Sequence, residues 1–425
     1  MLKDTAFQMA ASNIRFGRGI TDELGMDLVA MDVRRTMVVI DPALVSLPAG
    51  ETVLASLEEN GIYYQVFDAV SVEPTDSSFK AAAEFAVSGN FDSVVAVGGG
   101  STIDTAKAAN LYSTYPADFF DYVNAPIGKG LPVPGPLKPL IAVPTTAGTG
   151  SETTGVAIFD YVEKHAKTGI AHRHLKPTLG IVDPDNTVSL PSAVAAASGL
   201  DVLSHALESY TAMPFNERPM PPRPLERPAY QGSNPISDIW ALAALELMAE
   251  FLPNAVADTS DVEAREKMLL AAALAGIGFG NAGVHLPHGM SYPVAGMVAG
   301  YIPPGYDVDH SMVPHGISVI LNTPAVVRFT APASPERHLR AAAALGADIE
   351  RASTADAGEI LADRVIHFMR MLDVPNGLSA VGYTTADIPG LVEGTLPQHR
   401  VTKLSPKPAN ESDLTSLFEA SMTIW

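Results

Sequence analysis

The stretch FDSVVAVGGGSTIDTAKAAN, residues 91–110, predicts a buried strand, a run of three glycines and a helix that begins near Ser101. Glycines let a pyrophosphate approach the backbone closely, and the exposed amides at the start of a helix favour negative charge. The run is not the G-x-G-x-x-G fingerprint, and glycines after a strand also form plain turns. The stretch therefore indicates either a dinucleotide cradle or an ordinary strand-to-helix turn.

Short β-branched runs alternate with helical stretches along the first part of the chain. They are TMVVID (36–41), IYYQVF (62–67), DSVVAV (92–97), PLIAV (139–143), VAIFDY (156–161) and TLGIVD (178–183). This alternation is typical of a largely parallel sheet covered by helices. From Pro191 onward such runs nearly vanish and helical periods rich in alanine and leucine dominate. We therefore expect a Rossmann-like α/β domain over 1–191, which would bind a dinucleotide, and an all-α domain over 192–425.

A second loop, PTTAGTGSETT (144–154), follows PLIAV and offers hydroxyl groups beside flexible glycines. Open α/β sheets bind ligands at the carboxyl ends of their strands, where both loops begin. Asp41 ends TMVVID, where its carboxylate can accept from a ribose 2′-hydroxyl and so favour NAD over NADP, or can simply cap the next turn. The residues that we expect to bind NAD are Asp41, Gly98, Gly99, Gly100, Ser101, Asp104, Thr145, Thr146, Thr149 and Ser151.

A predicted helix, SGLDVLSHALESY (198–210), places Asp201 and His205 four residues apart on one face. Two Pro-His-Gly triplets follow, each expected in a Gly/Pro turn, at His288 and His315, and His285 is a rival to His288. One carboxylate and three imidazoles suit iron(II) or zinc better than calcium or magnesium. The alternative is a helix with a solvated aspartate and a packed histidine.

Composition and charge limit the class of protein. The chain has 425 residues, which predicts two domains, and its net charge of −20 argues against binding nucleic acid or an anionic membrane surface. Cysteine is absent, which excludes disulfides, thiolate metal ligands and cysteine nucleophiles. The first residues show no basic region followed by a long apolar run, so we expect a cytoplasmic protein.

Two further segments are unusual. Residues 268–306 contain no Asp, Glu, Lys or Arg, but glycines, prolines and histidines interrupt them, which favours buried helices and turns over a membrane span. Residues 213–235 carry proline at 214, 219, 221, 222, 224, 228 and 235, which predicts a long ordered loop or a flexible flap.

Several motifs together resemble the iron-containing (group III) alcohol dehydrogenase family, over the chain from about residue 8 to its end. In order they are GGGSTIDTAK, PTTAGTGSE, KTGI, PTLGIVDP, GLDVLSHALESY, HGMSYP and VPHGIS. The resemblance implies a dehydroquinate synthase-like architecture, with a nucleotide-binding α/β domain and a helical domain. It implies Lys167 as a residue near the nucleotide or substrate, and it implies the metal ligands Asp201, His205, His288 and His315, with the HGM match favouring His288 over His285.

Within the family, SNIRFGRG, YQGSNPISD, GVHLPHGMSYP and PERHLRAAAALGAD are most similar to the hydroxyacid-oxoacid transhydrogenases. This similarity implies hydride transfer through bound NAD, from 4-hydroxybutyrate, which becomes succinate semialdehyde, to 2-oxoglutarate, which becomes 2-hydroxyglutarate. Many alcohol dehydrogenases of the family have a histidine where this chain has Tyr292. A phenol holds its proton more firmly than an imidazole, so the candidate catalytic residue Tyr292 sets the usual proton relay in question.

The expected chemistry is metal-assisted hydride transfer, with iron(II), or zinc or another divalent ion, and NAD. Substrate carboxylates require cationic residues, for which Arg218, Arg223 and Arg227 are candidates, although charges on such a loop are commonly just solvated. Alternative functions are a plain NAD-dependent dehydrogenase of a small alcohol or aldehyde, a lyase on the same scaffold, and a non-catalytic binding protein. We also expect a homo-oligomer, a dimer or larger.

Overall fold

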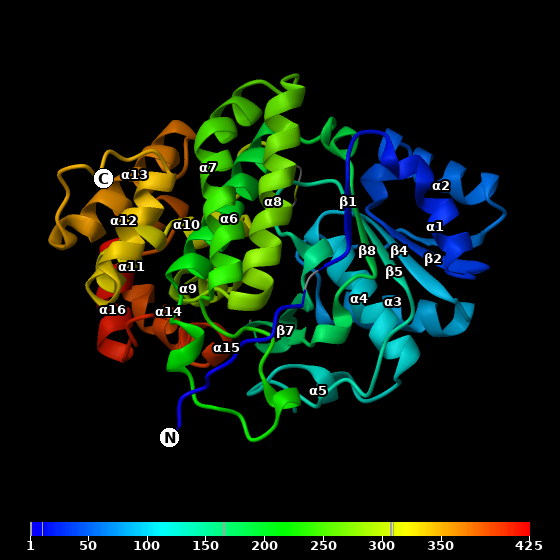
Figure 1. Ribbon diagram of the computed structural model, residues 1–425, viewed down its shortest axis with the longest axis horizontal. Helices are drawn as coiled ribbons and strands as arrows, with labels where there is room; N and C mark the ends of the chain where they lie inside the picture. The colour runs from blue at the N-terminus through cyan, green and yellow to red at the C-terminus, as the bar shows by residue number, and fades with distance from the viewer. Residues whose placement is uncertain (1, 11, 165, 307, 309) are drawn as a thin grey trace. The chain divides into compact units, whose positions relative to one another are not determined.

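Six parallel strands form the central sheet of the unit that spans Ala10–Leu190 (Figure 1). The computed structural model describes residues 2–10, 12–164, 166–306, 308 and 310–425. A second unit joins the N-terminal segment up to Met9 to Pro191–Trp425. The predicted class, a parallel α/β domain with a helical domain, is confirmed.

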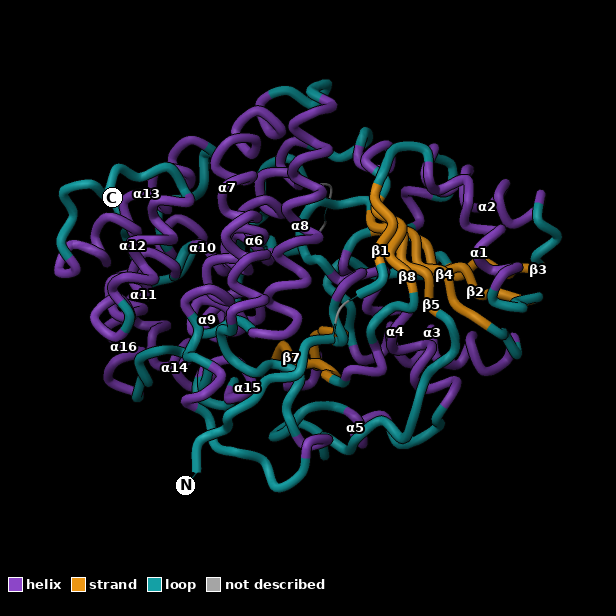
Figure 2. The backbone as a smooth tube through the Cα atoms, viewed as in Figure 1, coloured by secondary structure: helices purple, strands orange, loops and turns teal. Residues whose placement is uncertain are grey.

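The order of the strands reverses direction near the middle of the sheet (Figure 2). The order is β1 (Ile14–Phe16), β8 (Leu179–Val182), β5 (Leu140–Pro144), β4 (Ser93–Gly98), β2 (Arg35–Ile40) and β3 (Tyr63–Phe67). From β2 the chain continues to its neighbour β3, and then crosses back to β4 on the other side of β2. Open sheets bind ligands at such a reversal, outside the carboxyl ends of the strands.

Helices cover both faces of this sheet. Val38 and Ile40 of β2 pack in a cluster with α1 (Leu24–Ala30) and α2 (Pro48–Glu59). Met37 and Val39 of the same strand pack on the opposite face with α3 (Asp76–Gly89) and α4 (Gly100–Thr114). Because both faces are buried, the strand sequences are almost continuously apolar, as the β-branched runs predict.

A separate antiparallel pair, β6 (Val156–Tyr161) and β7 (Ala166–Ala171), and the short helix α5 (Phe119–Tyr122) complete this unit. The predicted strand VAIFDY therefore exists but lies outside the parallel sheet. The sequence does not predict β1 or β7. β1 has only three residues, all half-buried, so it carries too little pattern to recognise.

The regular elements after Leu190 are helical throughout the described residues. α6, α7 and α8 pack against one another, and the shorter helices follow. The helices are α6 (Ser192–Thr211), α7 (Pro235–Ala257), α8 (Val262–Ala282), α9 (Leu286–Gly296), α10 (His315–Ile320), α11 (Thr323–Thr330), α12 (Pro335–Ala344), α13 (Ala357–Met371), α14 (Ile388–Thr395), α15 (His399–Thr402) and α16 (Glu411–Ser421).

Two apolar parts of this unit reach the length and hydropathy of a membrane span. One is α7, of which a third (33%) of the most apolar window is buried, and the other is the pair α8 and α9, which is bent by 104°. Every residue from 275 to 294 is buried in the unit. The uncharged segment 268–306 thus contributes helices and turns to the core of the helical unit.

Within the proline-rich segment, residues 213–234 form a loop that contains two short 3₁₀ turns, Phe215–Glu217 and Pro224–Glu226, and Pro235 begins α7. The loop pairs with the N-terminal segment, because Asp4 N donates to Arg218 O at 2.9 Å and Lys3 and Pro219 form an antiparallel β-bridge. These contacts explain why the first residues belong to the helical unit.

Candidate functional site

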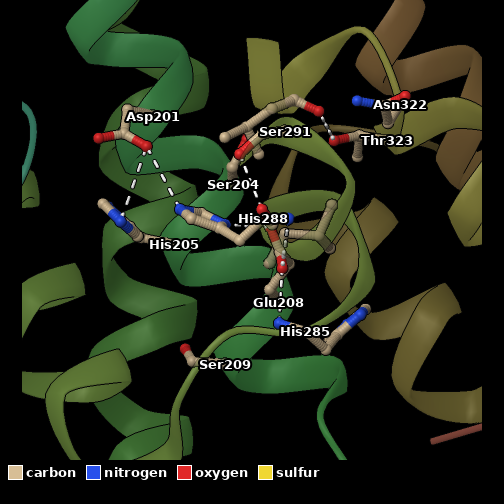
Figure 3. A network of polar contacts seen from close by, with 12 residues as sticks. Asp201, Ser204, His205, Glu208, Ser209, His285, His288, Ser291, Asn322 and Thr323 are labelled. Carbon is tan, nitrogen blue, oxygen red and sulfur yellow. Dashed lines mark hydrogen bonds and ion pairs between the residues drawn. The ribbon is translucent and has the colours of Figure 1, made fainter. Parts of the chain in front are cut away.

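Three histidines of the helical unit point one nitrogen each at the same oxygen of Asp201. Asp201 Oδ1 lies 3.6 Å from His205 Nε2, 3.6 Å from His288 Nε2 and 3.7 Å from His315 Nε2. Figure 3 shows His205 and His288 joined to the same oxygen of this carboxylate by dashed lines. The ligand atoms of Asp201, His288 and His315 all lie within 4.8 Å of one another, which is a spacing that can hold a metal ion. His205 is not one of these three residues, but its Nε2 lies 3.6 Å from the Asp201 oxygen.

Three helices supply these side chains. Asp201 and His205 lie one turn apart on α6, His288 is in the first turn of α9, and His315 is the first residue of α10. Proline is favoured where a helix begins, so the Pro-His-Gly triplets start helices and do not form the isolated turns expected from the sequence. A Cβ at Gly316 would lie 1.9 Å from Ala197 O, so glycine allows α10 to pack directly on α6.

Asp201, His205 and His288 are buried, His315 is half-buried, and three polar atoms of the site lack hydrogen-bond partners in the described parts of the chain: Asp201 Oδ1, His288 Nε2 and His205 Nδ1. Asp201 is 2% exposed and His288 3% exposed. Asp201 Oδ1 and His288 Nε2 accept or donate no hydrogen bond within the described parts of the chain. A buried polar atom without a partner costs about 1–3 kcal/mol, and a cation held between the two atoms would satisfy both. The residues therefore fit a divalent ion that prefers nitrogen and oxygen ligands.

Glu208 holds His288 from the other side of the ring, and sequence reasoning missed it. Its Oε1 accepts from His288 Nδ1 at 2.6 Å, and its Oε2 accepts from the backbone N of His285 at 2.6 Å (Figure 3). A carboxylate behind a ligating imidazole fixes the tautomer and the ring orientation. Its spacing could have revealed it, since Glu208 follows His205 by three residues on the same face of α6.

The buried charges perturb one another. Burial alone would raise the pKa of Asp201, but the surrounding histidines hold that pKa well below its usual range. Burial lowers the pKa of His205 to about 3. For His288, burial is outweighed by the carboxylates of Glu208 and Asp201, which raise its pKa to about 10. The two carboxylates therefore favour positive charge at His288, whereas burial disfavours it at His205.

His285, the rival to His288, has different surroundings. Its Nε2 lies 3.0 Å from Thr211 Oγ1, and burial lowers its pKa to about 4. It does not belong to the group that meets at Asp201. The structure thus brings His288, and not His285, to the candidate metal position.

Tyr292 lies one turn after His288 on α9. Its hydroxyl accepts from Arg400 Nη2 at 2.8 Å. Arg400, on α15, is a second residue that sequence reasoning missed, because nothing local in LPQHRVTK distinguishes it from a surface arginine.

The two glycine-containing loops lie against each other at the carboxyl edge of the sheet. A Cβ at Gly99 would lie 3.2 Å from the side chain of Thr146, and a Cβ at Gly100 would lie 2.6 Å from Thr149 Cγ2. Thr145 N donates to Gly98 O at 3.1 Å. Most of the residues expected to bind NAD are therefore brought together beside the start of α4, where glycine is required by close packing.

Asp104 and Ser151 belong to an internal network. Asp104 Oδ1 accepts from Ser151 Oγ and, at 3.2 Å, from Lys107 Nζ. Lys107 is 0% exposed and also donates to Val156 O at 2.7 Å; burial lowers its pKa. Sequence reasoning missed Lys107, although it follows Asp104 by three residues on one helix. The network anchors the second loop to α4, and a direct role in binding NAD stays a prediction.

The remaining cofactor candidates also have protein partners. Ser101 Oγ accepts from Glu73 N at 3.2 Å, and the buried Lys167 forms ion pairs with Glu73 and, at 3.2 Å, with Asp160. Asp41, at the carboxyl end of β2, caps the following turn by accepting from Ala43 N at 2.9 Å. The contact with ribose expected of Asp41 stays a prediction.

The arginines of the proline-rich segment contact carboxylates of this chain. Arg218 and Arg227 pair with the buried Asp4 at 2.6 and 3.0 Å. The side chain of Arg223 is 73% exposed and pairs with Glu226 at 2.6 Å. The structure therefore does not gather these three arginines at the metal position, and their role toward substrate stays a prediction.

Comparison with family models covers most of the chain. Residues 11–184 match the model described as iron-containing alcohol dehydrogenase. Residues 226–422 match the C-terminal model of the Fe-containing alcohol dehydrogenase family.

Curated relatives extend the match over the full length. The chain is 60% identical to hydroxyacid-oxoacid transhydrogenase, mitochondrial, of Bos taurus over 424 residues, which cover 99% of this chain and 91% of the relative. It is 55% identical to a probable mitochondrial hydroxyacid-oxoacid transhydrogenase of Dictyostelium discoideum over 437 residues, which cover 99% of this chain and 80% of the relative. The cytoplasmic location expected from the N-terminal sequence is wrong, because these relatives are named mitochondrial.

Solved structures share the fold. A 1,3-propanediol oxidoreductase has a TM-score of 0.85 at 28% identity and covers 98% of this chain and 100% of its own. A sulfoacetaldehyde reductase of Bifidobacterium kashiwanohense in complex with NAD⁺ has a TM-score of 0.82 at 27% identity and covers 99% of this chain and 100% of its own.

Proposed function

The chain belongs to the iron-containing alcohol dehydrogenase family and is an oxidoreductase of that family, and we propose that it acts as a hydroxyacid-oxoacid transhydrogenase with iron(II) and NAD. The hydroxy acid is 4-hydroxybutyrate and the oxo acid is 2-oxoglutarate. The observation that carries the proposal is the convergence of three histidine nitrogens on one buried oxygen of Asp201. The identity of 60% to a named transhydrogenase supports the choice of substrates.

The helical part, residues 192–425, provides the metal centre in this proposal. Asp201, His205, His288 and His315 hold the ion, and Glu208 keeps the ring of His288 in the ligating orientation. When bound, a divalent ion polarises the oxygen of an alcohol or a carbonyl group. Burial of Asp201 and His288 excludes water and so strengthens each electrostatic contact in the site.

The α/β part, residues 1–191, binds NAD in this proposal. The loops at Gly98–Gly100 and Thr145–Ser151 lie beside the start of α4, where free amides and the helix dipole attract a pyrophosphate. Held there, NAD would supply a hydride acceptor for the alcohol and, once reduced, a hydride donor for the ketone. Asp41 selects NAD over NADP through the ribose hydroxyl.

The coupled reaction balances without an external oxidant. 4-Hydroxybutyrate loses a hydride from its carbinol carbon and a proton from its hydroxyl, and succinate semialdehyde forms. 2-Oxoglutarate gains a hydride at its ketone carbon and a proton at its oxygen, and 2-hydroxyglutarate forms. The electrons lost by one acid are gained by the other, so the pair of substrates needs no further oxidant or reductant.

The competing function is a plain NAD-dependent alcohol dehydrogenase. The similarity to a 1,3-propanediol oxidoreductase supports it at the level of the fold and family. At Tyr292, however, the hydroxyl is engaged by an arginine, an arrangement suited to an anionic substrate.

The decisive assay incubates the metal-loaded protein with 4-hydroxybutyrate and 2-oxoglutarate, with and without added NAD, and measures semialdehyde. We expect semialdehyde without added NAD, and none when the oxo acid is omitted. A requirement for NAD in amounts equal to the product would instead establish a plain dehydrogenase.

A further inference from the structure

Arg400 is a cation without a carboxylate partner among the residues that the structure describes. Its Nη2 donates to the hydroxyl of Tyr292 at 2.8 Å, and its guanidinium lies 5.2 Å from the ring centre of Tyr230. Its Nη1 is buried and has no hydrogen-bond partner in the described chain. The side chain as a whole is half-buried. A buried donor that no group of the protein uses is costly, so Nη1 points to an anionic ligand.

The charge of Arg400 persists in this setting. Burial would lower its pKa, but contacts with Tyr292 and Tyr230 outweigh burial and raise that pKa. The guanidinium is therefore a permanent cation with donors in a planar fork, which matches the two oxygens of a carboxylate.

The position of Arg400 is tied to the metal centre through α9. Tyr292 follows His288 by four residues, a rise of about 6 Å along a helix. α15 packs closely on α9 at Gly289, where a Cβ would lie 2.6 Å from Thr402 Cγ2. Arg400 thus contacts a side chain that begins about one helical turn after His288.

We propose that Arg400 binds the carboxylate of the hydroxy acid and oxo acid substrates and that Tyr292 positions it. This inference rests on the proposed function and assigns its substrate-recognition residue. In 4-hydroxybutyrate, and toward the distal carboxylate of 2-oxoglutarate, three carbon–carbon bonds of about 1.5 Å separate the reacting carbon from the carboxylate carbon, a span comparable to one helical turn. The phenol at position 292 then orients a guanidinium rather than relaying a proton.

The other candidate arginines are less suited to this role. Arg218 and Arg227 pair with Asp4, and Arg223 pairs with Glu226, so their charges already have carboxylate partners. Arg400 differs because both of its polar neighbours are neutral hydroxyl groups.

The test compares metal-loaded wild type with Arg400→Gln, Tyr292→Phe and the control Arg340→Gln, whose side chain on α12 is 58% exposed. Glutarate, an unreactive dicarboxylate, is titrated by calorimetry, and kinetics are measured with 4-hydroxybutyrate and with 1,4-butanediol, its uncharged counterpart. We expect Arg400→Gln to raise both the Kd for glutarate and the KM for the hydroxy acid about 10- to 100-fold. Turnover of 1,4-butanediol and metal content stay at the wild-type level.

Tyr292→Phe separates positioning from proton transfer. We expect a smaller rise in the KM for the hydroxy acid, with kcat and its pH profile unchanged. A fall in kcat with a displaced pH profile would show a proton relay and overturn the positioning role.

An unchanged Kd for glutarate in Arg400→Gln overturns the assignment of Arg400. If that variant loses its metal, Arg400→Lys, which keeps the charge without the fork, takes its place, and an unchanged Kd there overturns it equally. Failure of the proposed function is seen separately, as wild type that binds glutarate but transfers no hydride between the two acids.

Discussion

Glu208 Oε1 accepts a hydrogen bond from His288 Nδ1 at 2.6 Å, so a buried carboxylate fixes the ring whose other nitrogen points at Asp201. Both partners are almost fully buried, at 1% and 3% exposed. Contacts of this kind behind a metal ligand orient it and raise its basicity.

Glu208→Gln should therefore weaken metal binding while leaving the four ligands in place. We expect the Kd for the metal to rise about 10- to 100-fold, measured by competition with a chelator. The matched control is Glu246→Gln, since the side chain of Glu246 on α7 is 58% exposed and should not affect the metal. Equal metal affinity in the two variants would contradict the role of Glu208.

His285 and His288 are two buried histidines at the start of α9, and they offer a matched pair of variants. His288→Ala should lose the metal and the activity, because its Nε2 faces Asp201. His285→Ala should retain the metal, because its Nε2 faces Thr211. Elemental analysis of both purified variants checks this, and the reverse result would reassign the ligand.

Gly100→Ala should weaken NAD binding, because the added Cβ would lie 2.6 Å from Thr149 Cγ2 and force the two loops apart. We expect the Kd for NAD to rise about tenfold, a loss of about 1.4 kcal/mol, measured by calorimetry. Adding Thr149→Ala removes two of the three close atoms and should restore part of the affinity.

Gly278→Ala is the control for this substitution, since the nearest atom to a Cβ there is 3.4 Å away. Wild-type NAD affinity in Gly100→Ala would contradict the placement of the cofactor at these loops.

His338 should make the stability of the helical unit depend on pH. It is 0% exposed, its Nε2 lies 2.9 Å from Thr330 Oγ1, and burial lowers its pKa from 6.5 to about 4. Between pH 6.5 and 4 the unfolded chain binds a proton that the folded chain does not. The stabilisation from neutral His338 is thus fully present above pH 6.5. It is lost as the pH falls toward 4, which lowers the free energy of unfolding by at most about 3 kcal/mol.

Denaturant unfolding at pH 7 and pH 4.5 measures this dependence. His338→Gln should reduce the loss of unfolding free energy between the two pH values, because the variant has no proton to gain. An equal loss in wild type and variant would show that His338 does not contribute.

Local pattern predicts much of this architecture because both faces of the sheet are covered. Strands such as β2 and β4 are recognisable by their continuous apolar residues, and the glycine run marks the start of α4 correctly. The strand VAIFDY has the same composition but pairs with β7, since composition does not specify a partner.

The candidate site shows the same limit. Spacing within one helix relates Asp201 to His205, but it does not show that Glu208 meets His288 or that Arg400 meets Tyr292. Those contacts join residues 80 and 108 positions apart and depend on how helices pack. The glycines after both histidines are informative in hindsight, because Gly316 and Gly289 mark the places where helices approach closely.

In the proposed function, one centre passes a hydride from a hydroxy acid to an oxo acid. The most direct measurement supplies 4-hydroxybutyrate with deuterium at its carbinol carbon, together with unlabelled 2-oxoglutarate and metal-loaded protein without added NAD. Mass spectrometry of the 2-hydroxyglutarate should show deuterium at carbon 2. Unlabelled 2-hydroxyglutarate, or none formed while the protein holds its metal, would contradict the account.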